Sequence, residues 1–320
     1  MFAGGGVCAE ALHLAVSDAG VQSELKWVAE CESKYIEAAG ENCLAITDDT
    51  VVLVGKVEEI EREHFTNVDV LQLSMPCAGF SGAGKAKHGM TPEMHSGTAI
   101  FGVSRAIESA QPAIIISENV IEARDSAMYA LLICELERLG YVVFQMVLDS
   151  QNTGTFEQRK RWWFVAFSKG IAPESFTVDD MLPSNLTLND LLDKSVPESA
   201  WTTHPYLVEK EARDIAAGKG FRRQLLKGDE KGCGTIGRFY SKRRSTEPFI
   251  VRPDNKERLL SLTEHARVKS VPEHLVAGLK MTVGHEILGQ SVDFMQPYLI
   301  MSKIMELPIY NTERAAWQHQ

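Results

Sequence analysis

The first 170 residues alternate between short apolar runs and segments of helical periodicity, and this alternation constrains the fold more than any other feature. The runs have the length of buried strands, and segments such as Asp125 to Leu139 place their apolar residues on one helix face. Alternating strands and helices are typical of a parallel sheet with helices on both faces. We therefore predict an α/β fold with a doubly wound parallel sheet. The predicted strands are residues 26–29, 50–54, 68–73, 113–117, 141–147 and 162–167.

The regular pattern loosens after about Gly170. Residues 171–200 carry three prolines with polar spacers, and residues 218–238 are rich in glycine. Regular patterning returns near Arg258, with helices predicted around Glu264 to Val268 and from about Met295 to Met305. We expect residues 1–170 and 256–320 to form one sheet domain, with residues 171–255 inserted as a separate, smaller module.

Composition places the chain among ordinary globular proteins. No run of about 18 apolar residues is present, so we expect no membrane span. The N-terminus lacks the charged and apolar regions of a signal peptide. The six cysteines are scattered without a C-x-x-C pair, which predicts reduced thiols, no zinc or other metal site, and a cytoplasmic protein.

The net charge of −10 is distributed unevenly. Between Lys219 and Arg252 the chain carries ten basic and three acidic residues, a local charge of +7 with −17 left for the rest. Phe221, Phe239 and Tyr240 are interleaved among these basic residues. Such a stripe is typical of a phosphate-binding surface, and an ordinary solvated charged face would have the same composition.

Met75-Pro76-Cys77-Ala78-Gly79-Phe80-Ser81 follows the apolar run 68–73 and reads as the turn that leaves a buried strand. Ligands bind at the carboxyl ends of strands in open α/β sheets. A thiol at this position can act as a nucleophile. The alternative is that Cys77 is a small buried residue, as most free cysteines are.

Two further segments place charged side chains beside predicted strands. Glu118, in Ser117-Glu118-Asn119-Val120, ends the strand 113–117 and can serve as a general acid; it could equally initiate a helix. Arg159-Lys160-Arg161 runs directly into the strand 162–167, where the arginines could bind a base or lie on the surface.

A glycine-rich turn, Phe2-Ala3-Gly4-Gly5-Gly6, opens into a helical pattern. Glycines at such a turn let a ligand approach the backbone, and an acidic residue 20 or more positions later can bind a ribose. Glu30, at the end of the next strand, is placed for that role. These two features alone would serve any nucleotide cofactor, including that of a nicotinamide-dependent oxidoreductase.

Together these residues resemble the DNA cytosine-5 methyltransferases, and the resemblance runs in the family's order through nearly the whole chain. The matching segments are Phe2 to Gly6, Glu30, Pro76-Cys77, Glu118-Asn119-Val120, Arg159-Lys160-Arg161, residues 258–272 and Gly289-Gln290-Ser291-Val292. The resemblance implies a Rossmann-like sheet that binds S-adenosylmethionine, with residues 171–255 as a smaller target-recognition module. The oxidoreductase reading leaves Cys77, Glu118 and the basic module without a role.

The implied reaction is methylation of C5 of a cytosine in double-stranded DNA. Cys77 would add to C6 while Glu118 protonates N3. Arg161 would hold the cytosine ring and Arg159 would support the same pocket. The target atoms are inaccessible in a duplex, so the base must be flipped out. A glutamate at position 118 favours the DNA-type enzyme over RNA methyltransferases of another family, which use a second cysteine there.

The resemblance also implies binding residues and partners. The implied cofactor contacts are Phe2, Gly4, Gly6, Glu30, Pro76, Gln290 and Ser291. Our candidates for DNA contacts in the middle module are Arg222, Arg223, Lys242, Arg243 and Arg244. We expect a monomer, and a cognate restriction endonuclease that acts separately.

The chain departs from the family pattern mainly on the cofactor side. It begins at Met1-Phe2, so the strand that precedes the glycine turn in the family is largely missing or lies upstream. Val7 replaces the third glycine, and Lys56, which cannot accept a hydrogen bond, stands where an acidic residue usually contacts the adenine. Glu157 replaces a usual Gln, and Gln290 a usual Asn. We therefore predict an active methyltransferase with altered cofactor contacts.

Two alternative hypotheses within the family remain open. The first is a tRNA cytosine-5 methyltransferase of the DNA type, although its usual Cys-Phe-Thr signature is absent. The second is a catalytically degenerate relative that binds DNA, for which Cys77→Ala would leave the effect on DNA unchanged.

Overall fold

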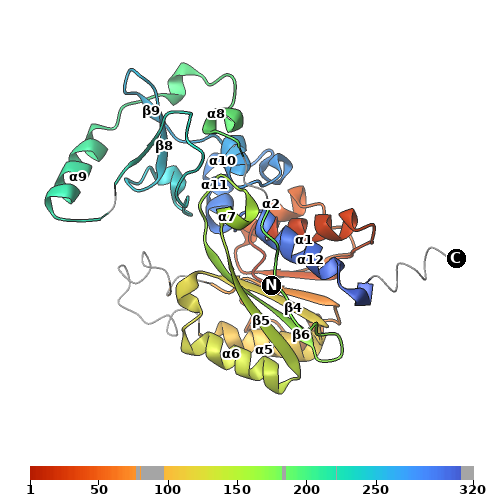
Figure 1. Ribbon diagram of the computed structural model, residues 1–320. Helices are drawn as coiled ribbons and strands as arrows, with labels where there is room; N and C mark the ends of the chain where they lie inside the picture. The colour runs from red at the N-terminus through yellow and green to blue at the C-terminus, as the bar shows by residue number, and fades with distance from the viewer. Residues whose placement is uncertain (77–79, 81–96, 182–184, 221, 311–320) are drawn as a thin grey trace. The chain divides into compact units, whose positions relative to one another are not determined.

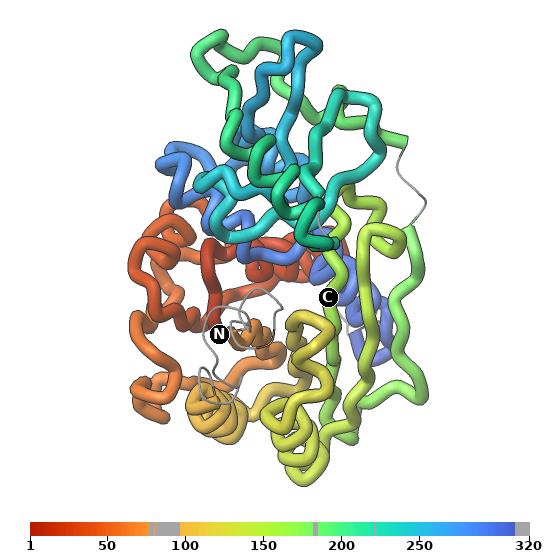
Figure 2. The backbone as a smooth tube through the Cα atoms, turned by 90° about the vertical axis from the view of Figure 1, so that its left-hand side faces the viewer, coloured from red at the N-terminus to blue at the C-terminus, as the bar shows by residue number. Residues whose placement is uncertain are grey.

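The computed structural model describes residues 1–76, 80, 97–181, 185–220 and 222–310. The chain packs into two compact units. Unit 1 comprises residues 1–149, 160–179 and 296–320, and unit 2 comprises residues 150–159 and 180–295. The chain therefore enters unit 2 twice along its length, as the colours of the tube in Figure 2 allow the reader to follow.

These packing boundaries differ from the predicted ones at three places, one of which is that residues 171–179 pack in unit 1. Residues 150–159 and 256–295 both pack in unit 2, rather than with the sheet domain. The reason is that each pairs with the middle segment: Glu157 forms a bridge with Cys233, and β9 (Glu257–Arg258) adds to the small sheet of unit 2. The division into catalytic and target-recognition parts stays a proposal.

The described residues of unit 1 form six strands in two ladders. The parallel pair is β1 (Trp27–Glu30) and β2 (Val51–Val54). The second ladder has the order β3-β4-β6-β5, with β3 (Val70–Leu73), β4 (Ile114–Asn119), β5 (Tyr141–Leu148) and β6 (Arg161–Ser168). All six predicted strands are confirmed to within a few residues.

The predicted all-parallel sheet is wrong in one respect, because β6 runs antiparallel to both β4 and β5. The sheet is therefore mixed. Strand direction depends on how the chain returns to the sheet, and the connection between β5 and β6 passes through unit 2 rather than through a crossover helix.

Residues 1–3 lie between the two ladders of unit 1. The Ala3 N–H donates to Ala29 O of β1 at 3.2 Å, while the Met1 nitrogen donates to Gln72 O of β3 at 2.7 Å. The Ser74 N–H also donates to Met1 O at 3.4 Å. These three hydrogen bonds link β1 to β3 at the point where the glycine turn begins.

The helices of unit 1 cover both faces of the sheet. They are α1 (Val7–Asp18), α2 (Ser33–Asn42), α5 (Ala99–Ala110), α6 (Ala127–Arg138) and α12 (Met295–Met305). Figure 1 shows α5 and α6 together on one side of β4, β5 and β6. On the other face, Trp163 of β6 donates its indole N–H to Gln296 of α12 at 2.7 Å. The predicted helices in these regions are confirmed.

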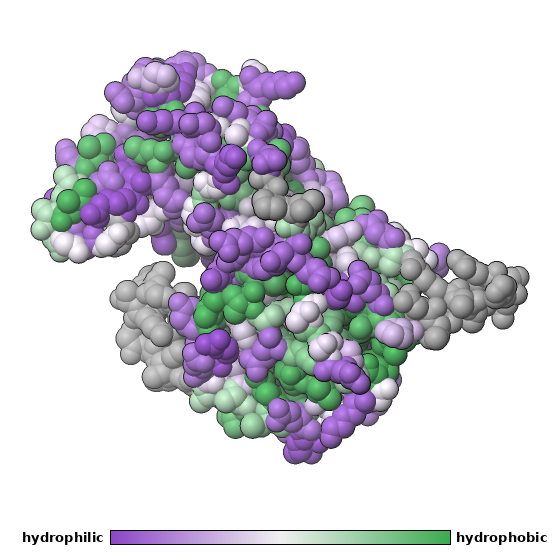
Figure 3. All heavy atoms as spheres, viewed as in Figure 1, coloured by the Kyte–Doolittle hydropathy of each residue, from purple (hydrophilic) through white to green (hydrophobic). Residues whose placement is uncertain are grey.

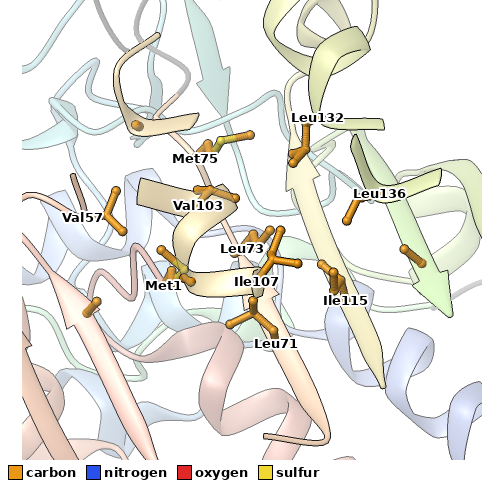
Figure 4. Close-up of a cluster of buried hydrophobic side chains, with 14 of the residues drawn as sticks. Met1, Val57, Leu71, Leu73, Met75, Val103, Ile107, Ile115, Leu132 and Leu136 are labelled. Atoms are coloured by element: carbon orange, nitrogen blue, oxygen red, sulfur yellow. The ribbon is translucent and has the colours of Figure 1, made fainter. Parts of the chain in front are cut away.

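The core of unit 1 lies between the sheet and the helix pair α5–α6. Val103 and Ile107, one helical turn apart on α5, point toward Leu71 and Leu73 of β3, as Figure 4 shows. Ile115 of β4 belongs to the same buried cluster. Burying each of these side chains contributes about 1.5–3 kcal/mol, so this layer fixes β3 and β4 firmly side by side.

Unit 2 is built from short elements around a smaller core. Its strands are β7 (Gln224–Leu226), β8 (Pro248–Val251) and β9, and its helices are α7 (Ser150–Thr153), α8 (Leu188–Leu191), α9 (Pro205–Ala216), α10 (Leu262–Val268) and α11 (Met281–Gln290). Short 3₁₀ turns in the two units span Arg62–His64, Ile121–Ala123, Glu198–Ala200, Tyr240–Lys242 and Glu273–Val276. In the view of Figure 3, hydrophilic side chains predominate around β9 and α8, and apolar ones gather on α9.

None of the helices in the described ranges has both the length and the apolar character needed to cross a bilayer. Within the same ranges, no group of three or more His, Cys, Asp or Glu side chains is arranged to hold a metal ion.

Candidate active site and nucleic-acid interface

Glu118 and Arg161 lie close together at one end of the four-stranded ladder β3-β4-β6-β5 of unit 1. Glu118 lies near the end of β4, Arg161 begins β6, and the antiparallel register brings the two strand ends together. The Arg161 Nε atom lies 3.7 Å from Glu118 Oε2, and the side chains are 12% and 14% exposed. A carboxyl group and a guanidinium thus stand together at a site that water, or a ligand, can reach.

Asn119 ties this strand end to the segment that enters the Pro-Cys turn. Its amide nitrogen donates to Met75 O at 2.9 Å and to the Tyr129 hydroxyl at 2.8 Å. Met75 is buried and directly precedes Pro76, which is exposed. Phe80, also buried, has its ring centroid 6.3 Å from that of Tyr129. Asn119 thus joins Met75 to Tyr129, and Phe80 packs near the same tyrosine; Cys77 itself lies outside the described residues.

The role of Asn119 was missed by sequence reasoning, which used only Glu118 of this motif for chemistry. The sequence signal for this role was the amide of Asn119, directly after the acid Glu118 near the end of a strand. An amide can donate and accept at once, and here it donates to Met75 O while its oxygen accepts from the Val120 N–H at 2.8 Å.

The glycine turn of unit 1 has the open geometry expected of a ligand-binding turn. Gly4 and Gly6 have φ values of +52° and +84°, which disfavour any side chain. A Cβ atom at Gly6 would also lie 2.9 Å from Cys43 Cβ, whereas one at Gly4 would meet nothing within 4 Å. Gly6 is therefore required for packing against α2, and the space at Gly4 is left open.

Glu30 is buried and binds the backbone of the same turn. Its carboxylate accepts from the N–H groups of Gly4 at 2.8 Å, Cys31 at 2.9 Å and Glu32 at 3.0 Å. Burial, together with the charge of Glu30, raises the pKa of the Cys31 thiol to about 11. The carboxylate thus holds the glycine turn against the end of β1.

The remaining cofactor candidates lie in both units. Phe2 of unit 1 packs against the core with φ +58°. In unit 2, Gln290 is exposed with its side-chain nitrogen donating to Glu286 O at 3.1 Å, and the Ser291 hydroxyl donates to Leu288 O at 2.9 Å. Lys56 of unit 1 is 63% exposed, with Nζ 3.3 Å from Glu59 Oε1.

Arg159 is buried in unit 2 and does not present its guanidinium to solvent. Nη1 donates to Ile236 O at 3.3 Å, and Nη2 donates to the carbonyls of Gly289 and Gln290 at 3.2 Å. Arg159 was predicted as a residue of the catalytic pocket. Its hydrogen bonds link two segments of unit 2, and its role in the catalytic pocket stays a prediction.

Arg223 was also predicted as a DNA contact. Its guanidinium is buried, forms an ion pair with Glu257 and lies 5.3 Å from the centre of the Phe249 ring. Arg222 is exposed, and its side chain donates to Lys219 O at 2.8 Å. Burial, which a basic stripe in the sequence does not reveal, separates these two neighbouring arginines.

Lys242, Arg243 and Arg244 are exposed, and Lys242 and Arg244 lie over one aromatic ring. Lys242 Nζ and Arg244 Cζ each lie 4.6 Å from the centre of the Phe239 ring, and Arg238 Cζ lies 5.6 Å away. Beside them, a surface hollow of about 390 Å³ is lined by Tyr206, Leu207, Lys210 and residues 242–246. We call Phe239 with Arg238, Lys242, Arg243 and Arg244 the basic cluster.

Curated proteins similar to this chain are bacterial type II methyltransferases. M.SsoII of Shigella sonnei is 26% identical over 249 residues, which is 74% of this chain and 64% of that enzyme. M.NlaX of Neisseria lactamica is 25% identical over 74% of this chain and 76% of its own length. The chain thus spans less than two thirds of the length of the Shigella enzyme.

Solved structures share the fold at low sequence identity. The S. pombe Dnmt2 methyltransferase superposes with a TM-score of 0.76 at 15% identity, covering 95% of this chain and 97% of that one. A DNA modification methyltransferase from an E. coli prophage gives a TM-score of 0.65 over 96% of this chain and 97% of its own, also at 15% identity. The predicted Rossmann-like methyltransferase fold is confirmed.

The sequence profile that describes C-5 cytosine-specific DNA methylases matches residues 1–305, nearly the whole chain. The match includes the glycine turn, the strand ends that carry Glu118 and Arg161, and the module that carries the basic cluster. The chain belongs to the C-5 cytosine-specific DNA methylase family.

Proposed function

We propose that this protein transfers a methyl group from S-adenosylmethionine to C5 of a flipped-out cytosine in duplex DNA, through a covalent adduct between Cys77 and C6. Family membership supports the reaction class. The observation that carries the proposal is the pair of Glu118 and Arg161, 3.7 Å apart, on a strand end that Asn119 ties to Met75.

The two side chains suit the two tasks that the base requires. A protonated carboxyl at Glu118 can give its proton to N3, and the guanidinium of Arg161 can donate hydrogen bonds to the exocyclic oxygen of cytosine. N3 and the exocyclic oxygen on C2 are neighbouring groups of one base, so the two side chains must stand within a few ångströms of each other, as they do.

The proposed reaction then proceeds in three steps. The Cys77 thiolate forms a bond to C6, the electrons of the C5–C6 double bond shift through the ring, and N3 takes the proton of Glu118. C5 next bonds to the methyl carbon while the carbon–sulfur bond of the donor breaks. Loss of the C5 proton to a base expels the thiolate and restores the C5–C6 double bond, and N3 returns its proton to Glu118.

S-adenosylmethionine, when bound, supplies the electrophilic methyl group, and the residues of the glycine turn fit it. Gly4 has open space beside a positive φ, so the backbone can approach a ligand closely. Each oxygen of Glu30 has two lone pairs, so Oε2 can accept from a ribose hydroxyl while it accepts from Gly4. Val7 is the buried first residue of α1, where its side chain packs in the core.

The basic cluster is the proposed surface for duplex DNA. Exposed cations around an aromatic ring can bind phosphates while the ring packs against a sugar or base. We propose Lys242, Arg243, Arg244 and Arg222 as contacts, and we remove Arg223. We further propose that the protein acts as a monomer in the cytoplasm, beside a restriction endonuclease that acts separately.

A duplex in which 5-fluorocytosine replaces cytosine tests the covalent route. Fluorine cannot leave C5 as a proton does, so we expect wild-type protein with S-adenosylmethionine to give an adduct that survives denaturing electrophoresis, and Cys77→Ala to give none. Methylation of ordinary duplex without an adduct on the fluorinated one would overturn the covalent route.

Bisulfite sequencing of DNA from cells that express the protein would identify the target sequence. Methylation of tRNA transcripts but not of duplex would overturn the proposed substrate. A protein that binds duplex equally well as wild type and as Cys77→Ala, with no methylation by either, would instead be a degenerate relative.

A further inference from the structure

A buried network of charges in unit 2 surrounds Glu157, one of the residues that depart from the family pattern. Residues 156–158 pair with residue 233: the Cys233 N–H donates to Phe156 O at 3.1 Å, and the Gln158 N–H donates to Cys233 O at 2.8 Å. On the opposite side, the Glu157 N–H donates to Val268 O at 3.0 Å. Glu157 therefore lies between the segment around Cys233 and the end of α10.

The Glu157 carboxylate divides its two oxygens between these neighbours. Oε1 accepts from the Ile236 N–H at 2.7 Å and lies 3.5 Å from Arg159 Nη1. Oε2 forms an ion pair with Lys269, the residue that follows α10. The side chains of Glu157 and Lys269 are completely buried, and that of Arg159 nearly so. A charge buried so deeply is tolerated only with close partners.

Arg159 extends the network to a third segment. It binds the carbonyl of Ile236, whose N–H is bound by Glu157, so both polar groups of that peptide residue are held. Its other nitrogen binds Gly289 O and Gln290 O at the end of α11. A Cβ atom at Gly289 would collide with Gly237 O, so the two segments touch there. The cation also complements the negative end of the helix dipole.

The two segments joined in this way carry proposed binding residues. Ile236 and Gly237 lead directly into Arg238 and Phe239 of the basic cluster. The end of α11 leads into Gln290 and Ser291, the cofactor candidates of unit 2. Removing the charge of Glu157 would leave Arg159 and Lys269 facing each other, with Asp293 as the other buried acid acting on Lys269.

We propose that Glu157 and Lys269 are positioning residues: their ion pair fixes Arg159, and Arg159 holds the base of the basic cluster against the end of α11 that carries Gln290 and Ser291. This inference rests on the proposed function, because it assigns DNA and cofactor contacts to the two segments. It predicts that removing the charge of Glu157 weakens the binding of both DNA and S-adenosylmethionine, although Glu157 contacts neither of them.

Three variants test the pair: Glu157→Gln, Lys269→Gln, and the double change. We expect Glu157→Gln to weaken DNA binding and raise the KM for S-adenosylmethionine by about tenfold, with kcat at saturation within about threefold of wild type. The double variant replaces the ion pair by two amides that can bond to each other. It should recover most of both losses, because the cation of Lys269 no longer opposes Arg159, which keeps its hydrogen bonds to the carbonyls of Ile236, Gly289 and Gln290.

Glu264→Gln is the matched control for lost stability. Glu264 is another fully buried carboxylate of unit 2, and it binds Arg258 through both oxygens at 2.6 and 2.8 Å. We expect Glu264→Gln to lower the melting temperature as Glu157→Gln does, without a comparable change in DNA affinity or KM. Equal changes in binding for both variants would reduce Glu157 to a merely structural role and overturn the proposal.

Hydrogen exchange at the Ile236 amide provides a readout that does not depend on methyl transfer. We expect this amide to exchange about tenfold faster in Glu157→Gln than in wild type, and to be restored in the double variant. Unchanged exchange in Glu157→Gln, or no recovery in the double variant, would contradict the positioning role. If wild-type protein methylates nothing, the exchange result still decides this inference separately from the proposed function.

Discussion

Two pairs of a carboxylate with a cation occupy the two units, and they differ in burial and in tightness. Glu118 and Arg161 of unit 1 stand 3.7 Å apart and retain some exposure. Glu157 and Lys269 of unit 2 are fully buried and in direct contact. A tightly paired buried charge is committed to holding its neighbours, whereas a looser, reachable pair can exchange its partner for a ligand. This difference is why we propose a catalytic role for the pair in unit 1 and a positioning role for the pair in unit 2.

The largest effect we expect is a loss of kcat when the pair in unit 1 is changed. Glu118→Gln removes the proposed proton donor but keeps the shape of the side chain, so kcat should fall by about 10²–10⁴-fold. Because the pair is partly exposed and 3.7 Å apart, the free energy of unfolding should change by less than about 1 kcal/mol. Single-turnover methylation and urea unfolding measure the two quantities. A variant that unfolds easily but methylates normally would reverse the roles assigned here.

Lys269→Met should have the opposite profile. It leaves Glu157 buried without its closest cation, so the free energy of unfolding should fall by about 3–5 kcal/mol. Urea denaturation of wild type and variant gives the difference. Lys256→Met removes an exposed lysine of the same unit that pairs with Glu198 at 2.6 Å, and should cost less than about 1 kcal/mol. Equal losses for both lysines would show that burial does not distinguish these pairs.

A third test uses pH, because unit 2 also buries two neutral imidazoles. His265 and His285 lie with their Nδ1 atoms 2.9 Å apart, and burial lowers the pKa of His285 from 6.5 to about 4 and that of His265 well below its ordinary value. In the unfolded chain these two histidines take up protons below about pH 6.5, whereas in the folded chain they stay neutral down to lower pH. Stability is therefore full above pH 6.5 and is lost as the pH falls toward about 4.

For His285 alone this loss amounts to roughly 3 kcal/mol across that window. Thermal unfolding measured between pH 7 and pH 4 would follow it. His285→Gln keeps an acceptor for His265 and removes one titrating group, so its stability should fall less steeply over the same range. Parallel curves for the two proteins would exclude His285 as a source of acid sensitivity.

The smallest effect we expect compares an exposed arginine with a buried one, both from the basic stripe of residues 219–252. Arg244→Gln should weaken duplex binding a few-fold and lower the slope of log K against log salt by about 1, because one phosphate contact is lost. Arg223→Gln should leave that slope unchanged, because its guanidinium is paired with Glu257. Fluorescence anisotropy over a salt series compares them, and a changed slope for Arg223→Gln would restore it as a DNA contact.

Much of unit 1 could be predicted from the sequence because its signals are local. Apolar runs of strand length and one-sided helices require only neighbouring residues to be recognised, and every predicted strand is present. The direction of β6 was not local information, since it depends on a connection that runs through unit 2. The position of Cys77 stays a prediction, as it lies outside the described residues.

The candidate site divides in the same way. The residues Glu118 and Arg161 could be named from motifs, and their proximity follows once β4 and β6 are adjacent. The burial of Arg159 and Arg223 could not be predicted, because a basic residue looks the same in a sequence whether it faces solvent or a buried carboxylate. Lys269 was not singled out, since its partner Glu157 is distant in sequence and close only in the fold.

The sequence by itself determined the family, the order of strands and helices in unit 1, and the residue types available for chemistry, because these depend on local pattern and on motif order. Only the tertiary structure decided which charges are free to meet a ligand. Burial and pairing arise from contacts between distant segments, and they join Arg159, Glu157 and Lys269 in one buried network, which we propose supports the binding surface.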